Sequence, residues 1–91
     1  MPRVASAAAA HVGLAIAERR RQLAMTQDEL AAGSGIDSSN IRAYENGRAM
    51  PSLHSLVRIA AAVNLEPGAL IQGLTAELFT VPTVDGRRRR A

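Results

Sequence analysis

Turn-forming residues divide this chain into short stretches, and this division limits its fold more than any other feature. The stretches are separated by Gly33-Ser34-Gly35, by Asn46-Gly47 and by Pro51-Ser52. Apolar residues within the stretches recur at the spacing of amphipathic helices, and nowhere do they alternate with a period of two. We therefore expect an all-α fold made of short helices.

Residues that favour helix ends set the expected boundaries. Thr26-Gln27-Asp28-Glu29 is a capping box, in which the Thr26 hydroxyl and the Glu29 carboxylate each accept a backbone amide. Asp37 is an N-cap candidate, because the first amides of a helix favour its carboxylate. Asn64 tolerates the left-handed conformation that can end a helix. The five expected helices span residues 9–24, 26–33, 38–45, 52–63 and 67–71.

The core of this fold has to be aliphatic. The 91 residues suffice for one domain, and aromatic residues make up only 2% of them, namely Tyr44 and Phe79. The candidate core residues are the apolar ones that recur at helical spacing: Leu23, Leu30, Ile36, Ile41, Tyr44, Leu53, Leu56, Ile59 and Ala60.

Composition excludes several classes of protein. There is no cysteine and there are only two histidines, His11 and His54, so we expect no disulfide, no thiolate chemistry, no structural zinc site and no cofactor. No activated nucleophile or carboxylate pair is assembled, so we expect no enzyme. The sequence contains neither a membrane-spanning stretch nor a secretory signal, and we expect a cytoplasmic chain.

The net charge of +3 is unevenly distributed along the chain. All 11 basic residues are arginines, and four of them are Arg87 to Arg90. Residues 1–86 therefore carry a net charge of −1. If the folded part binds DNA, it has to concentrate a few arginines on one face.

A set of residues at fixed spacing carries a family resemblance. It comprises Arg20, Gln27, Leu30-Ala31, Gly35-Ile36, Ile41, Tyr44-Glu45-Asn46-Gly47-Arg48, Pro51-Ser52-Leu53, Leu56 and Ile59-Ala60. Over residues 10–72 this pattern resembles the phage repressor and Cro family of DNA-binding domains, the xenobiotic-response-element type. The resemblance implies a five-helix, lambda-repressor-like domain with a helix-turn-helix, whose second helix enters the major groove.

The resemblance also implies which residues touch DNA. Ser38, Ser39 and Ala43 fall at base-facing positions. They are small, and a serine hydroxyl can bond either a donor or an acceptor edge, so Asn40, Arg42 and DNA shape are expected to contribute to specificity. The expected phosphate contacts are Gln27, Asn46, Arg48 and Arg20. Arg20 and Glu45 correspond to a pair that bridges the first and third helices, and for Arg20 this structural role is expected to dominate.

Beyond the motif, an apolar stripe consists of Leu70, Ile71, Leu74, Leu78 and Phe79. We expect it to form a dimer contact, and the alternative is that it covers the domain's own core. The expected organisation is a flexible arm at 1–8, the helix-turn-helix domain at 9–72, the apolar extension at 73–80 and a flexible basic tail at 81–91. The tail would add phosphate contacts or only keep the chain soluble.

These features predict a sequence-specific transcriptional regulator that binds double-stranded DNA. The preferred hypothesis is a repressor that binds a pseudo-palindromic operator as a homodimer. Four alternatives stay open: an antitoxin with a toxin partner, a restriction-modification controller, an activator that touches a polymerase subunit, and a coactivator-like scaffold for protein interactions.

Overall fold

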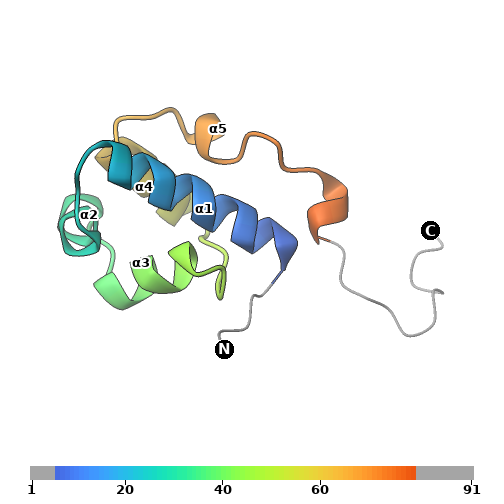
Figure 1. Ribbon diagram of the computed structural model, residues 1–91, viewed down its shortest axis with the longest axis horizontal. Coiled ribbons are helices and arrows are strands. Elements are labelled where there is room, and N and C mark those ends of the chain that lie inside the picture. The colour runs from blue at the N-terminus through green and yellow to red at the C-terminus, as the bar shows by residue number, and fades with distance from the viewer. Residues whose placement is uncertain (1–5, 80–91) are drawn as a thin grey trace.

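The computed structural model describes residues 6–79, which form five α-helices and a short 3₁₀ helix without any strand. The elements are α1 (Ala7–Gln22), α2 (Gln27–Ser34), α3 (Ser38–Glu45), α4 (Leu53–Ala62), α5 (Pro67–Leu70) and η1 (Ala76–Phe79). Figure 1 shows α1 running through the middle of the molecule, with α3 on one side of it and α5 on the other. The predicted all-α, five-helix fold is confirmed.

The first helix begins and ends earlier than expected. It starts at Ala7 because the Ser6 hydroxyl caps it, accepting the amide of Ala9 at 3.0 Å. Ala8 is fully buried, so the expected arm at 1–8 is too long. The helix ends at Gln22, before Ala24 takes a left-handed conformation with a φ of 55°. The rest of the arm and the tail at 81–91 lie outside the described residues.

Local signals of the expected kind set the next two helices. The capping box at the start of α2 is complete: the Thr26 hydroxyl accepts the Glu29 amide at 3.0 Å, and the Glu29 carboxylate accepts the Thr26 amide at 2.8 Å. The helix ends at Ser34, and its C-cap Gly35 has a left-handed φ of 72°. Gly47, with a φ of 75°, lies just beyond the end of α3.

The hydrophobic core lies where α1, α2, α3 and α4 meet. Its largest fully buried side chains are Val12, Ile16, Leu30, Ile41, Ile59, Val63 and Leu70. The prediction is wrong for two of the expected core residues, because Leu23 is 39% exposed and Leu53 is 75% exposed. Each lies at a helix end rather than within the buried face: Leu23 is the C-cap of α1, and Leu53 is the first residue of α4. Tyr44 is half-buried and packs against the core from its edge.

The backbones of α1 and α3 approach each other closely at Gly13, which is buried. A Cβ atom at this position would collide with the main-chain carbonyl oxygen of Tyr44 and crowd that of Glu45. Because backbone atoms cannot rotate away as a side chain does, only glycine fits here without separating the two helices.

The segment after α4 returns along the other side of α1 (Figure 1). His11 Nε2 lies 2.7 Å from the Gln72 carbonyl oxygen and ties this segment to α1. Leu70 is only 1% exposed and belongs to the core, so its expected place at the edge of a dimer contact is wrong. No helix among residues 6–79 is long and apolar enough to cross a membrane.

Candidate nucleic-acid interface

Helices α2 and α3 and the turn between them form a helix-turn-helix unit. At the turn, the amides of Gly35 and Ile36 donate to the Ala31 carbonyl at 2.9 and 3.2 Å. Arg58 of α4 donates from Nη2 to the Gly35 carbonyl at 3.3 Å, and its guanidinium fills the space beside this glycine. The turn is therefore held by its own backbone and by a side chain from α4.

The five residues expected to contact bases all lie on α3. Ser39, Asn40 and Arg42 are exposed, and Ser38 and Ala43 are half-buried. On the opposite face of the helix, Ile41 is fully buried in the core. The helix therefore presents small and polar side chains outward, while its apolar inner face is anchored in the core.

A polar network connects α3 to both preceding helices. Glu45 accepts Arg20 Nε at 2.7 Å and Arg20 Nη2 at 2.9 Å, a bidentate pair in which the side chains are 4% and 12% exposed, respectively. Gln27 Nε2 donates to the same carboxylate at 2.9 Å. The hydrogen bond to Glu45 raises the pKa of Arg20 above its ordinary value; desolvation opposes this shift, and the charge of Glu45 reinforces it. The network fixes the end of α3 against α1 and the start of α2.

This network engages two residues that were expected to contact phosphate, Arg20 and Gln27. Arg20 also donates from Nη1 to the Met25 carbonyl at 2.8 Å, so every nitrogen of its guanidinium is engaged within the protein. This geometry serves the bridge between helices rather than a phosphate. Gln27 is half-buried, and its amide nitrogen is oriented by Glu45 at the first turn of α2.

A second, looser set of contacts lies on the exposed side of α3. Arg42 Nη1 lies 3.9 Å from Asp28 Oδ1 of α2, and Arg42 Nη2 donates to the Ser38 hydroxyl at 3.4 Å. Asp37 stands at the N-cap of α3, but its side chain makes no capping hydrogen bond. Its carboxylate instead accepts the Ser39 hydroxyl at 3.0 Å, so the expected capping role of this carboxylate is wrong.

Asn46 and Arg48 follow α3 and are both exposed. Gly47 between them is buried, and its amide donates to the Tyr44 carbonyl at 3.0 Å. The Arg48 amide donates to the Ala43 carbonyl at 2.9 Å. The turn thus fixes the backbone of Arg48 while its side chain stays exposed.

Sequence reasoning missed three residues that hold this unit together. Gly13 permits the contact between α1 and α3, and Arg58 supports the turn. Arg19 donates from Nε to the Val63 carbonyl at 2.9 Å and from Nη2 to the Asn64 carbonyl at 3.4 Å, so it binds the end of α4. Two weak signals were available in the sequence: Gly13 interrupts an apolar helical pattern, and Arg58 has no acidic residue near it in the chain.

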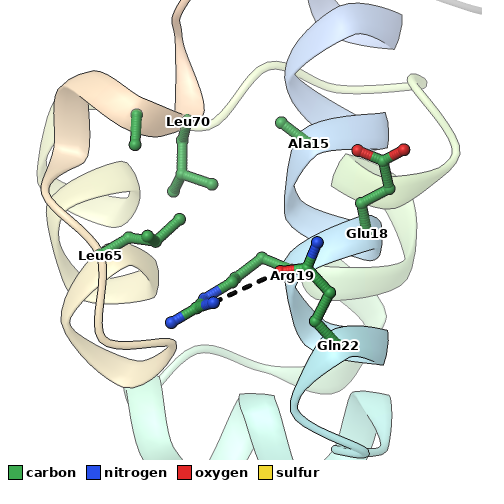
Figure 2. Close-up of a pocket in the computed structure, with 7 residues that line it drawn as sticks. Ala15, Glu18, Arg19, Gln22, Leu65 and Leu70 are labelled. Atoms are coloured by element: carbon green, nitrogen blue, oxygen red, sulfur yellow. Dashed lines mark hydrogen bonds between the residues drawn. The ribbon is translucent and has the colours of Figure 1, made fainter.

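A small hollow lies between α1 and the α5 segment, on the side of α1 away from α3 (Figure 2). Its volume is about 180 Å³, and it is lined by Ala15, Glu18, Arg19, Gln22, Leu65, Ala69 and Leu70. The Arg19 guanidinium already bonds to Gln22 and to the end of α4. Among residues 6–79 no group of histidine or acidic side chains could hold a metal ion. The exposed face of α3 is thus the stronger candidate site.

Comparison with known proteins relates the chain to regulators. The family model described as helix-turn-helix matches residues 16–70. An uncharacterised helix-turn-helix-type transcriptional regulator of Methanothermobacter thermautotrophicus is 45% identical over 51 residues, which are 56% of this chain and 74% of that protein. The ImmF control region 10 kDa protein of Bacillus phage phi105 is 34% identical over 59 residues, covering 65% of this chain and 66% of that protein.

A solved structure shows the same fold. The restriction-modification controller protein C.AhdI from Aeromonas hydrophila superposes with a TM-score of 0.67 at 31% sequence identity. The match covers 68% of this chain and 94% of that one.

Proposed function

Because the chain belongs to the helix-turn-helix family of Cro/C1-type transcriptional regulators, we propose that it binds double-stranded DNA sequence-specifically with α3 in the major groove. The observation that carries this proposal is the arrangement of α3. Its outward face is polar, its inward face is buried, and Glu45 at its end is locked to α1 and α2. A rigidly mounted polar helix is what base reading requires.

The contact set that we propose follows the exposed side of this helix. Base contacts come from Ser38, Ser39, Asn40, Arg42 and Ala43. Phosphate contacts come from Asn46 and Arg48 beyond the helix and from Gln27 at the start of α2, where the side-chain amide adjoins the free backbone amides of a helix N-terminus. Arg20 is left out because its guanidinium is engaged within the protein.

We further propose that the protein is a repressor that binds a pseudo-palindromic operator as a homodimer. One helix-turn-helix reads about half a site, and small side chains on α3 make a single copy a weak reader. Ile71 is 39% exposed and Phe79 is 52% exposed, and with the half-buried Leu74 and Leu78 they form the proposed contact. Apolar side chains this exposed gain by being covered by a second copy.

Sedimentation velocity tests the proposed contact. Phe79→Glu should shift the protein toward monomer, because it would place a charge within an apolar contact. The matched control is Leu14→Glu, which alters a residue 62% exposed on α1, outside the proposed contact. A dimer that persists in Phe79→Glu, or that is lost equally in Leu14→Glu, contradicts this assignment of the interface.

Selection from a random double-stranded DNA library tests the binding function itself. The protein should enrich one sequence as two inverted half-sites whose centres lie about one helical turn apart. If no sequence is enriched while circular dichroism shows a folded helical protein, sequence-specific binding is contradicted.

A restriction-modification controller is a second candidate, favoured by the likeness to C.AhdI over 94% of that chain. Mapping the selected sequence onto the source genome separates the two candidates. A site upstream of restriction or modification genes favours the controller, and a site elsewhere favours a repressor of other genes.

A further inference from the structure

The carboxylate of Asp37 is placed where it controls a neighbouring hydroxyl. In α3 the amides of Asn40 and Ile41 donate to the backbone carbonyl of Asp37 at 3.0 and 3.1 Å, while its side chain caps nothing. The side chain instead accepts the hydroxyl of Ser39 at 3.0 Å. Both residues are exposed, so this contact lies on the face that the proposed function turns toward DNA.

The chemistry of the two groups fixes the direction of this hydrogen bond. An ionised carboxylate has only acceptors, so the Ser39 hydroxyl has to donate its single proton to Asp37. Two lone pairs then remain on the Ser39 oxygen, and this oxygen can only accept further hydrogen bonds. The ambiguity of a serine, which in general can donate or accept, is removed at this position.

A base in the major groove does not easily reverse this direction. The acceptors there, such as guanine O6 and N7 or thymine O4, are neutral, and a hydrogen bond to an ionised group is the stronger of the two. The Ser39 hydroxyl therefore continues to donate to the Asp37 carboxylate when a base acceptor approaches. Only a base that presents a donor can therefore form a hydrogen bond to the Ser39 oxygen.

We propose that Asp37 is a specificity-determining positioning residue, which makes Ser39 accept from adenine N6 or cytosine N4 and so disfavours guanine and thymine at that base. This inference rests on the proposed DNA binding and deepens it. Adenine and cytosine are the two bases with an exocyclic amino donor in the major groove.

Ser38 provides an internal comparison on the same helix. Arginine has only donors, so Ser38 accepts from Arg42 Nη2 at 3.4 Å, and its own hydroxyl can still donate to a base. Within residues 6–79 no carboxylate is hydrogen-bonded to Ser38. Base preference at the position that Ser38 contacts should therefore not change when the Asp37 charge is removed.

The experiment is selection from a random double-stranded library, followed by affinity measurements on the selected site with each base substituted in turn. It compares the wild type with Asp37→Asn, Ser39→Ala and Asp28→Asn. Asp37→Asn keeps the size of the side chain and removes its charge. The amide nitrogen can donate to Ser39, and the amide oxygen is a weaker acceptor than a carboxylate, so the hydroxyl proton is no longer held in one direction. Asp28→Asn is the matched control, because it removes the same charge from the neighbouring helix without touching Ser39.

We expect the wild type to prefer adenine or cytosine at one position of each half-site by about fivefold, the worth of one hydrogen bond. Asp37→Asn and Ser39→Ala should both reduce this preference to less than about twofold, and Asp28→Asn should leave it unchanged while raising affinity for all sequences. Thermal melts should show that Asp37→Asn stays folded, since its side chain caps nothing.

Other outcomes overturn the inference in distinguishable ways. If Asp37→Asn keeps the preference, the carboxylate does not set it. If Ser39→Ala keeps it, Asp37 reads the base directly. A selected site without such a position overturns this inference alone, whereas the absence of any selected site overturns the proposed function with it.

Discussion

Two arginine–carboxylate pairs in this molecule have the same chemistry and opposite surroundings. The inner pair, Arg20 with Glu45, is bidentate at 2.7 and 2.9 Å, and its side chains are 12% and 4% exposed. The outer pair, Arg42 with Asp28, is 3.9 Å apart, and its side chains are 49% and 82% exposed. One end of α3 is therefore fixed by charge, while its exposed side carries charges that are free to change partners.

The difference shows how one short helix can be held rigidly and still keep a side chain free to bind DNA. A pair removed from water resists the loss of either partner, because the remaining charge would be buried alone. A pair in water contributes little to stability and exchanges its partner easily. The inner pair thus holds α3 against α1, and the outer pair leaves Arg42 able to bind a phosphate or a base.

Breaking the inner pair should have the largest effect on stability. Glu45→Ala leaves the Arg20 guanidinium buried without a countercharge and removes the partner of Gln27. We expect the free energy of unfolding to fall by about 3 kcal/mol or more, as measured by urea denaturation. The matched change in the outer pair, Asp28→Ala, should shift it by less than about 0.5 kcal/mol. Similar losses for both variants would contradict the comparison.

The contact between the backbones of α1 and α3 should show the next largest effect. Gly13→Ala places a Cβ atom against the Tyr44 carbonyl and pushes apart the two helices that the inner pair joins. We expect a loss of about 2 kcal/mol in the free energy of unfolding. Gly68→Ala is the control, because nothing lies within 4 Å of its added Cβ atom. That variant should be neutral or slightly more stable, and equal losses would argue against a specific contact at Gly13.

On the exposed side, effects should appear in binding rather than in stability. Arg48→Ala should weaken binding to all DNA sequences about equally and lower the slope of log affinity against log salt by about one unit. Ser39→Ala should instead reduce discrimination between matched and mismatched sites by about 1 kcal/mol. Binding titrations at several salt concentrations separate the two effects. If Arg48→Ala changes sequence preference, Arg48 is a base reader and not a phosphate contact.

The smallest effect concerns the turn that follows α1. Arg20 donates to the Met25 carbonyl, and Ala24 just before it has a φ of 55°, a conformation that strains any residue with a Cβ atom. Ala24→Gly should therefore raise the free energy of unfolding by up to about 1 kcal/mol. A lower melting temperature in this variant would show that the inner network holds the turn without strain.

The sequence predicted the fold better than the surroundings of individual side chains. Capping and turn residues are local signals, so the capping box, the end of α3 and the left-handed Asn64 agree with the structure. The family resemblance and the all-α class are confirmed. These features depend on neighbours in the chain, which a single sequence displays.

What could not be predicted depends on contacts between distant segments. Periodicity places Leu53 on an apolar pattern, yet whether a helix end faces the core depends on how the helices are docked. Asp37 is a residue type that favours the N-cap, but its carboxylate accepts the Ser39 hydroxyl and caps no amide. The backbone partners of Arg19 lie at residues 63 and 64, too far along the chain for any spacing rule to predict. The proposed base and phosphate contacts stay predictions.

The close approach at Gly13 also bears on how two surfaces would adjust to each other. Because the end of α3 rests on α1 through main-chain atoms, it cannot slide or tilt there by a change of side-chain conformation. When such a helix meets a groove of slightly wrong width, the duplex has to bend or twist to meet it. The affinity for DNA would then depend on the stiffness of base steps that the protein does not contact. Substitutions in the flanking sequence would change affinity without changing any contact.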